Sequence, residues 1–437
     1  MLEVLNTLLW GLGTLALILG TGAWLTLRTG GFPQRNLGRA LALSLGREAR
    51  RKGRGGVSPF GSLMTALAST VGTGNIVGVA AALVWMELAA FLGLAAKFAE
   101  CMLAVKYRHA RRDGTRWGGP MAVMEARLGA PGRWMGKLFA VFALLMAFTM
   151  GALAQSGALA DTFSAAFTLP RWRVGLVTAA LALTILLGGI RRIADISTVL
   201  VPVMALLYLG GGLAVILGNL RRLPEAVTLM LRCAVAPEAA LGGALGIVTR
   251  REALRWGVAR SVFSNEAGLG SAAITAACAD TEDPVKQGLI SMTGVFFDTM
   301  VICTVTGLAI CCSGALGAAD GKGRPLTGAA LTLRAFETVL GPLAPWLIGA
   351  SLGLFAFTSV LGCAVQAETT ASYLLGPEAV RPCRVLYGLA VFAGAVIPMA
   401  TVLQLADLAN ALMAFPNLVC LLLLSGEIAG ECGRKDR

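Results

Sequence analysis

Apolar residues fill long stretches of this chain, and polar residues are concentrated in the shorter stretches between them. A helix needs about 20 predominantly apolar residues to cross a hydrocarbon layer of about 30 Å. The pattern predicts eleven such helices, of which the seventh is the shortest. They cover residues 4–27, 59–84, 85–105, 138–162, 172–190, 196–218, 237–250, 287–312, 345–374, 385–404 and 407–428. The chain is therefore expected to be an all-α polytopic membrane protein, a single transmembrane domain over residues 1–437.

Two further stretches, 224–233 and 327–340, have an apolar face but are too polar to span, so we expect them to lie flat at the membrane interface.

The first apolar stretch carries Glu3, with no preceding basic region and no small-residue cleavage pattern. It is therefore expected to be a retained helix and not a signal peptide.

The composition supports a membrane location and explains the net charge. With 56% hydrophobic and 14% charged residues, the chain cannot hide its apolar surface in a soluble core. Of the 37 Lys and Arg residues, 28 fall in segments that are cytoplasmic if the N-terminus is outside, and 8 fall on the other side. Basic residues stay preferentially on the cytoplasmic side. The prediction is a multi-pass protein of the cell (plasma) membrane, with the N-terminus outside and the C-terminus cytoplasmic.

The same bias accounts for the net charge of +13, so no nucleic-acid partner is expected. The basic run at residues 47–54 is expected to meet anionic membrane lipid. The ten cysteines are scattered, apart from the adjacent Cys311 and Cys312, and show no metal or disulfide spacing. We expect them to be small buried apolar residues.

Enzymatic motifs were not found. The single histidine, His109, lies in a basic loop, which excludes paired-histidine metal sites and disfavours a catalytic triad. No phosphate-cradling loop appears, so uphill work would have to draw on an ion gradient. The chain is expected to be a secondary transporter, not an enzyme, with no cofactor.

Residues 69–75, Ser-Thr-Val-Gly-Thr-Gly-Asn, interrupt the second apolar stretch. Glycine and polar residues weaken a helix, and a broken membrane helix persists only where its freed backbone groups line a cavity or meet a ligand. Backbone N–H groups around Thr73, Gly74 and Asn75 would bind a carboxylate, while carbonyl and side-chain oxygens, including those of Gly72, Thr73 and Asn75, would bind sodium. The alternative is a glycine-lined contact between helices.

Several strings resemble the alanine or glycine:cation symporter family, which belongs to the amino acid-polyamine-cation superfamily with a leucine-transporter-type fold. The matching strings lie at residues 72–80, 97–100, 104–108, 118–121, 187–190, 256–260, 264–272, 355–357, 405–407 and 412–417. The resemblance implies two inverted five-helix repeats, 58–218 and 237–430, preceded by an extra N-terminal helix and basic loop at 1–57. This agrees with eleven spans.

By this resemblance, residues 59–84 form core helix 1, and residues 237–250, with Gly242 and Gly243, form its inverted partner, core helix 6. Both helices are interrupted by glycine, as expected where a substrate site lies at mid-membrane between repeats. Loose glycine packing is the alternative account of Gly242 and Gly243.

The resemblance also assigns residues in the fourth and ninth stretches. Gln155 matches a glutamine expected to bind the substrate carboxylate, and its alternative is a hydrogen bond to a neighbouring helix. Thr358 and Ser359 match hydroxyls of the sodium site, although such hydroxyls often bond to their own helix. Cys363 lies in the substrate pocket where the family carries a bulky tryptophan.

Two departures from the family pattern affect the expected function. About eight residues are missing before Trp85-Met86, which shortens the outer part of core helix 1 or its turn. Cys363, with Val365 and Gln366 beyond it, removes a wall of the pocket, so strict selectivity for alanine or glycine is in doubt.

Four charged positions lie in or near apolar stretches. Lys97 and Glu100 are expected to neutralise each other, with Lys97 snorkelling to the inner interface. Asp298 and Glu368 should face a partner or a cavity, and either could carry protons. Residues 264–272 are expected to form part of an inner gate, in which Glu266 pairs with Arg260 or Arg255, or Ser264 and Asn265 cap a helix.

The resulting hypothesis is sodium-coupled import of a small neutral amino acid by alternating access, by a protein that functions as a monomer in lipid. The alternatives are proton coupling, a different small substrate, or a sensor that binds an amino acid without carrying it. A membrane enzyme is disfavoured because no catalytic constellation is evident.

Overall fold

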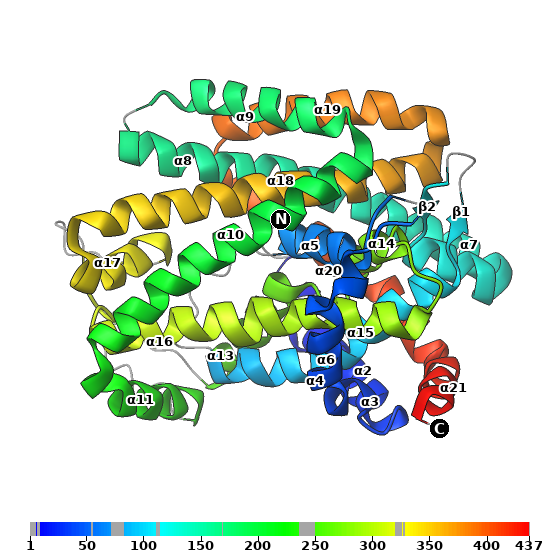
Figure 1. Ribbon diagram of the computed structural model, residues 1–437, viewed down its shortest axis with the longest axis horizontal. Coiled ribbons are helices and arrows are strands. Elements are labelled where there is room, and N and C mark those ends of the chain that lie inside the picture. Colours follow the sequence, from blue (N-terminus) through cyan, green and yellow to red (C-terminus); the bar gives the residue numbers. More distant parts are fainter. Residues whose placement is uncertain are drawn as a thin grey trace.

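The chain folds into a bundle of long helices in the computed structural model, which describes residues 6, 9–53, 56–70, 83–110, 114–167, 169–235, 250–319, 326 and 328–436. Figure 1 shows most of the long helices lying side by side. Within the described residues, seven helical segments are long and apolar enough to cross a membrane. They are Leu83–Lys106, Pro120–Ser164, Gly189–Gly218, Pro284–Ser313, Gly328–Leu375, Pro377–Val396 and Val402–Leu423.

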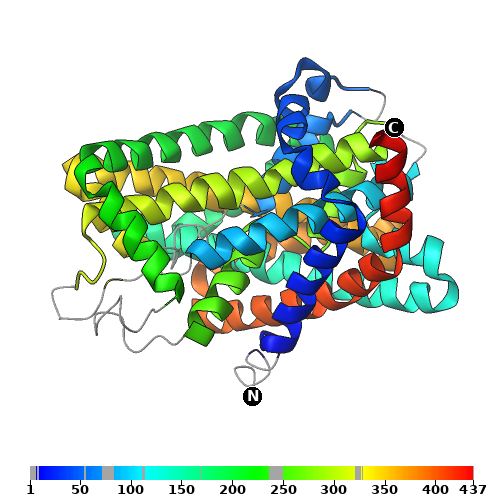
Figure 2. The ribbon, with the colours of Figure 1, turned by 90° about the horizontal axis from the view of Figure 1, so that it is seen from below.

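The N-terminal half begins with α2 (Leu12–Arg28), which crosses the bundle obliquely and reaches the C-terminal helix (Figure 2). The remaining helices of this half include three membrane-length segments: α6, the continuous α7–η3–α8 segment and α10. In order they are α3 (Phe32–Arg35), α4 (Leu37–Leu45), η1 (Arg47–Arg50), α5 (Pro59–Thr70), α6 (Leu83–Lys106), α7 (Pro120–Met146), η3 (Ala147–Ala154), α8 (Gln155–Phe167), α9 (Arg171–Leu186), α10 (Gly189–Gly218), η4 (Leu220–Arg222) and α11 (Leu223–Val235).

The C-terminal half is also helical and ends with α21 beside the C-terminal end of α6 and the N-terminal part of α7. Its helices are α13 (Arg250–Asn265), α14 (Ser271–Ala277), α15 (Pro284–Val295), η5 (Phe296–Cys303), α16 (Thr304–Ser313), α17 (Gly328–Leu340), η6 (Gly341–Leu343), α18 (Ala344–Leu375), η7 (Pro377–Ala379), α19 (Val380–Val396), α20 (Met399–Leu423) and α21 (Ser425–Asp436). A short antiparallel hairpin pairs β1 (His109–Ala110) with β2 (Arg116–Trp117).

Several helix boundaries differ from the prediction, and the one between the last two predicted spans has a clear local cause. The helix predicted at residues 385–404 ends at Val396, and α20 begins at Met399 after Pro398. Proline has no N–H and keeps the residue before it out of the α region, so the break falls there. The stretches predicted to lie at the interface are helices, α11 and α17.

Two helical segments, η3 and η5, are wound as π-helix. A π-helical segment widens the helix and often accompanies a functional site. One joins α7 to α8 immediately before Gln155, and the other contains Asp298. Neither was predicted, because the apolar pattern of a π-helix does not differ from that of an α-helix.

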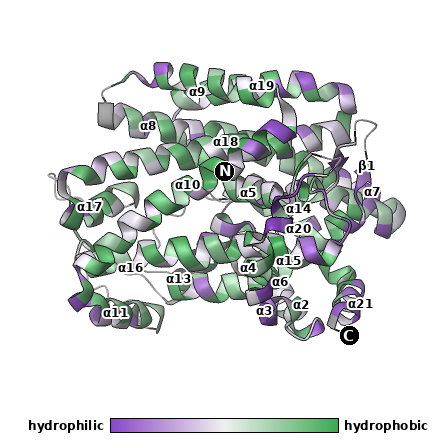
Figure 3. Cartoon of the chain, viewed as in Figure 1, coloured by the Kyte–Doolittle hydropathy of each residue, from purple (hydrophilic) through white to green (hydrophobic). Residues whose placement is uncertain are grey.

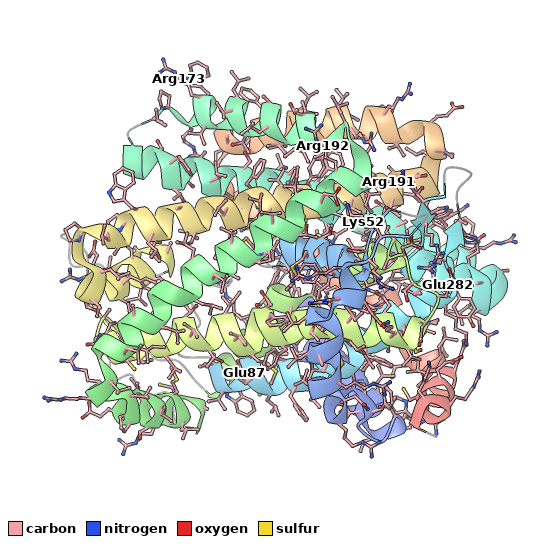
Figure 4. The ribbon with its side chains drawn as sticks, viewed as in Figure 1. Lys52, Glu87, Arg173, Arg191, Arg192 and Glu282 are labelled. Atoms are coloured by element: carbon pink, nitrogen blue, oxygen red, sulfur yellow. The ribbon has the colours of Figure 1, made fainter. Side chains whose placement is uncertain are left out.

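Hydrophobic residues lie along the long helices, and charged residues lie near the ends of these helices. Figure 3 shows hydrophobic residues along the long helices and hydrophilic ones gathering around β1, α7 and α21. Arg173 lies at one end of α9, whereas Arg191 and Arg192 lie at the other end of this helix, with Lys52 nearby (Figure 4). Lys52 forms an ion pair there with Asp195 of α10. Arg173 and the other three residues therefore lie at opposite ends of α9, and which end is cytoplasmic stays a prediction.

Candidate functional site

Helix α18 carries three of the predicted site residues and packs against both α5 and the η3–α8 segment. Its approach to α5 depends on Gly362. A Cβ atom at this position would lie 2.5 Å from the backbone nitrogen of Ser69 and 2.9 Å from the carbonyl oxygen of Thr65. Gln366, one turn further on, donates a 3.2 Å hydrogen bond to the Ser69 hydroxyl. The described end of α5 therefore lies directly against α18.

Cys363 faces the π-helical segment η3. A Cβ atom on Gly151 would lie 2.2 Å from the Cβ of Cys363 and 2.8 Å from the Tyr387 hydroxyl, so only glycine fits there. Further along, a Cβ on Gly353 would lie 2.9 Å from the ring of Phe163. These two contacts show that η3 and α8 run antiparallel to α18.

This register places Gln155 along α18. Gln155 is about a third of the way from Gly151 to Phe163, so it lies near the level of Ser359. The side chain is 3% exposed, and its amide oxygen accepts no hydrogen bond from any described residue. A buried amide oxygen without a partner costs about 1–3 kcal/mol, which a ligand that donates a hydrogen bond to this oxygen would recover.

Thr358 and Ser359 are fully buried, and their hydroxyls point along their own helix. The Thr358 hydroxyl donates to the carbonyl oxygens of Leu354 and Phe355 at 2.9 and 3.0 Å, and the Ser359 hydroxyl donates to Phe355 at 2.9 Å. Because each proton is directed at a carbonyl, the hydroxyl oxygen keeps lone pairs that can face a cation. The oxygen chemistry fits a hard ion such as sodium.

The remaining predicted site residues lie outside the described part of the chain. These are Gly72, Thr73, Gly74 and Asn75 of the predicted break, and Gly242 and Gly243 of its predicted partner. Their described neighbours are Thr70, at the end of α5, and Arg250, at the start of α13. Thus the structure brings Gln155, Ser359 and Cys363 to one part of α18, next to the end of α5.

Two predictions about charged residues were wrong. Lys97 does not snorkel, because it is 2% exposed and donates a 2.7 Å hydrogen bond to the carbonyl oxygen of Asn265. Glu266 accepts a hydrogen bond from the Ser271 hydroxyl, in place of an ion pair with Arg255 or Arg260. Neither partner can be read from sequence spacing, because both depend on how the loop after α13 folds back.

The prediction that Asp298 and Glu368 have partners is confirmed. Asp298 accepts hydrogen bonds from Ser264 and Thr299, and Glu368 forms a two-point ion pair with Arg384 at 2.7 and 2.8 Å. The sequence singled out Gln366 only as a departure from the family pattern, and did not predict its bond to Ser69, which links α18 to the helix that carries the predicted break.

Comparisons with known proteins identify the family of this chain. The model of the "Sodium:alanine symporter family" matches residues 1–433. The chain belongs to the sodium:alanine symporter family. This is a family of cation-coupled amino acid transporters, so the chain is a transporter and not an enzyme, as predicted from its motifs.

Relatives match over nearly their whole length. An uncharacterized transporter of Haemophilus influenzae is 43% identical over 98% of this chain and 94% of its own. The sodium/alanine symporter AgcS of Methanococcus maripaludis is 39% identical, with 99% of this chain and 96% of its own covered. The probable sodium/glutamine symporter GlnT of Bacillus subtilis is 36% identical, with 97% and 87% covered.

A solved structure shares the fold. The crystal structure of MhsT in complex with L-phenylalanine aligns with a TM-score of 0.59, covering 83% of this chain and 88% of that one, at 14% identity. The likeness therefore concerns the arrangement of helices. Together with the family match and the apolar helices, it identifies a multi-pass helical membrane transporter.

Proposed function

We propose that this protein imports a small neutral amino acid together with sodium, by alternating access between two inverted five-helix repeats. The substrate site comprises Thr73, Gly74, Asn75, Gln155, Gly242, Gly243 and Cys363. The sodium site comprises Gly72, Asn75, Thr358 and Ser359. The first repeat covers residues 58–218 and the second 237–430, with the N-terminus outside.

The observation that carries this proposal is the convergence on α18. Gln155, whose amide oxygen has no partner among the described residues, the hydroxyl of Ser359 and the end of α5 approach the same part of this helix. A zwitterion needs donors for its carboxylate and acceptors for its ammonium. Gln155 supplies amide N–H donors without adding charge, and the freed backbone of a broken helix would supply donors and acceptors.

The substrate class follows from charge and size. The side chains that we assign to this part of α18 are an amide, hydroxyls and a thiol, and each of these groups is neutral. A neutral amino acid leaves no unpaired side-chain charge in such a site. Gly151 and Cys363 are in tight contact, so the wall on this side is close to the backbone and favours a short side chain.

Relatives support the coupling ion. The names of AgcS and GlnT specify sodium with alanine and glutamine respectively. Since the family contains proteins named for different amino acids, we propose the class of small neutral amino acids and not one member of it. Sodium is cargo here, and no resident cofactor is required.

Uptake by the full chain in sealed proteoliposomes tests the proposal. We expect an inward sodium gradient to drive accumulation of radiolabelled alanine or a similar amino acid, and replacement of sodium by choline to abolish it. Gln155→Ala should lower uptake about tenfold or more, because a hydrogen bond to a charged group contributes about 1.5–3 kcal/mol.

Gln287→Ala is the matched control. Gln287 is also fully buried with an unpaired amide oxygen, but it lies on α15. Its variant should transport normally per folded molecule. Sodium-independent accumulation driven by a pH gradient would favour proton coupling, and sodium-dependent binding without accumulation would favour a sensor.

A further inference from the structure

Four of the segments that resemble the family lie together at the loop that follows α13. They are residues 97–100, 118–121, 264–272 and 412–417. Lys97 of α6 donates to the carbonyl oxygen of Asn265 at 2.7 Å, and Glu100 accepts from the backbone N–H of Gly270 at 3.1 Å. Asn417 of α20 donates to Glu100 at 3.0 Å and to the carbonyl oxygen of Gly268 at 2.9 Å. Gly270 also packs against Pro120, at the start of α7.

This junction buries one ammonium with two carboxylates. Lys97, Glu100 and Glu266 are 2%, 2% and 5% exposed. Lys97 lies within electrostatic range of both carboxylates, and these lie close enough to repel each other. The described groups that face them are otherwise neutral: Asn417, the N–H of Gly270 and the Ser271 hydroxyl. If both carboxylates were ionised, the trio would carry an uncompensated negative charge in the core, which is costly.

A second observation shows that the ammonium does not satisfy the nearer carboxylate. The Lys97 nitrogen lies 3.9 Å from Oε1 of Glu100, too far for a hydrogen bond. This buried oxygen accepts no hydrogen bond from any described residue. Oε1 of Glu100 is therefore an unused hydrogen-bond acceptor. With both carboxylates ionised, the cluster would have one positive charge fewer than it has negative charges.

A bound proton is a better source of the compensating positive charge than a bound sodium ion. A sodium ion would need several oxygen ligands, but the carbonyl oxygen of Asn265 is already taken by Lys97, whose ammonium stands near both carboxylates. A proton needs only one carboxylate oxygen. Mutual repulsion of two buried carboxylates is relieved when one of them is protonated.

Hydrogen bonding indicates which carboxylate holds the proton. Oε2 of Glu100 accepts two N–H bonds, from Gly270 and Asn417, and such bonds favour the ionised form. Glu266 accepts from the Ser271 hydroxyl, its hydrogen-bond partner among the described residues, and a hydroxyl can serve either form by rotating. The neutral form is therefore favoured at Glu266.

The backbone at Glu266 is also unusual. Its φ is +51°, and no other non-glycine residue in the described part of the chain has a positive φ. Gly268 and Gly270, in the same loop, both have φ of +84°. A bulky residue in the left-handed region costs of order 1–3 kcal/mol, so glycine would suit the backbone better. The backbone conformation does not explain why residue 266 is glutamate, so we attribute this choice to the carboxyl side chain.

We propose that Glu266 is a proton-binding site, protonated while the loop is packed between α6, α7 and α20. The carboxyl O–H bond breaks, and the proton passes to water, when the loop separates from these helices. Glu266 lies within electrostatic range of the Cys363 thiol, which connects the proton site to the candidate substrate wall. The link to transport rests on the proposed function, but proton binding itself does not.

Infrared spectroscopy of the purified full chain tests proton binding without transport. We expect a protonated-carboxyl band at neutral pH that Glu266→Gln reduces by one carboxyl, and that Glu282→Gln leaves unchanged. Glu282 is the control because its side chain is 85% exposed. Glu266→Asn provides a second neutral variant, since asparagine tolerates the left-handed region. An unchanged band in both Glu266 variants would overturn the proposal.

Vesicles containing a pH-sensitive dye test the link to transport. Amino acid import by the wild-type protein should acidify the lumen, whereas Glu266→Gln should import without this acidification or lose import. Acidification that persists with Glu266→Gln would show that another group carries the proton. If the wild-type protein imports nothing, the proposed function fails while the infrared result still decides the proton site.

Discussion

Serine and threonine in a membrane helix commonly bond to the preceding turn, and Thr358 and Ser359 both do so. This back-bonding is not evidence against a cation site, because it consumes the hydroxyl proton and leaves the oxygen as an acceptor. The two oxygens differ in their surroundings. Thr358 also lies 3.3 Å from the sulfur of Met204 on α10, whereas Ser359 is near the level of Gln155.

Removing the Ser359 hydroxyl should weaken sodium binding. Ser359→Ala deletes one ligand oxygen, and we expect the sodium concentration for half-maximal uptake to rise about tenfold, equivalent to about 1.4 kcal/mol. Ser351→Ala is the control, because Ser351 is equally buried on the same helix with no hydrogen-bond partner for its hydroxyl among the described residues. Equal sodium dependence in the two variants would exclude Ser359 as a ligand.

For individual residues, the sequence identified the polar side chains that need a partner in an apolar stretch, but it did not identify those partners. Polar residues in an apolar stretch stand out, so Gln155, Asp298 and Glu368 could be selected from the pattern. The partner of Lys97 could not, since Asn265 is 168 positions away and accepts through its backbone, which every residue has. Backbone acceptors carry no residue-type signal.

Glycine determines how closely α18 approaches its neighbours. Gly362 allows contact with α5, and Gly353 and Gly151 allow contact between α18 and the η3–α8 segment. Between membrane helices, small residues allow close van der Waals packing, which substitutes for the hydrophobic effect. The site is therefore positioned by packing at glycine as much as by polar groups.

Adding a methyl group at Gly362 should separate α5 from α18. Gly362→Ala places a Cβ 2.5 Å from the backbone nitrogen of Ser69, and we expect it to destabilise the fold by about 1–3 kcal/mol. Gly349→Ala, on the same helix with nothing within 4 Å of the added carbon, should be neutral or stabilising by up to about 1 kcal/mol. Thermal unfolding in detergent compares them, and equal melting temperatures would contradict the close contact.

Helical elements were largely predictable, because lipid requires a long apolar run. The stretches at 196–218, 287–312 and 345–374 each fall within a described helix or a continuous helical segment. The π-helical winding of η3 and η5 was not predictable, and neither was the hairpin of β1 with β2, since both depend on tertiary packing. The predicted break at 72–75 lies outside the described residues.

At the scale of the whole molecule, the C-terminal helix α21 forms ion pairs and hydrogen bonds with segments that are distant from it in sequence. Glu427 accepts from Lys106 at 2.6 Å, from Arg127 at 3.0 Å and from the Tyr107 hydroxyl. Glu431 also pairs with Lys106 at 2.6 Å, and Lys435 pairs with Asp283, at the start of α15, at 2.7 Å. The end of the chain is thereby held against α6, α7 and α15.

This attachment should weaken in acid. Burial raises the pKa of Glu427, but hydrogen bonds from Lys106 and Tyr107 lower it by more, so the net pKa lies below the ordinary value of 4.5. A carboxylate with a lowered pKa in the folded state stabilises that state above its unfolded pKa, and the stabilisation is lost as pH falls through the folded value. Glu427→Gln should therefore lower the melting temperature at pH 7, and the difference from wild type should shrink below about pH 4.5.

Glu337→Gln distinguishes this attachment from general loss of surface charge. Among the described residues, Glu337 pairs with Arg334 of the same helix across a 3.4 Å contact, and an ion pair between partly exposed side chains contributes little. Its variant should unfold like the wild type at every pH. If Glu427→Gln also matched the wild type at pH 7, the ion pairs of α21 would contribute nothing to the fold, and the helix would be held by its apolar face through Ile428 and Cys432.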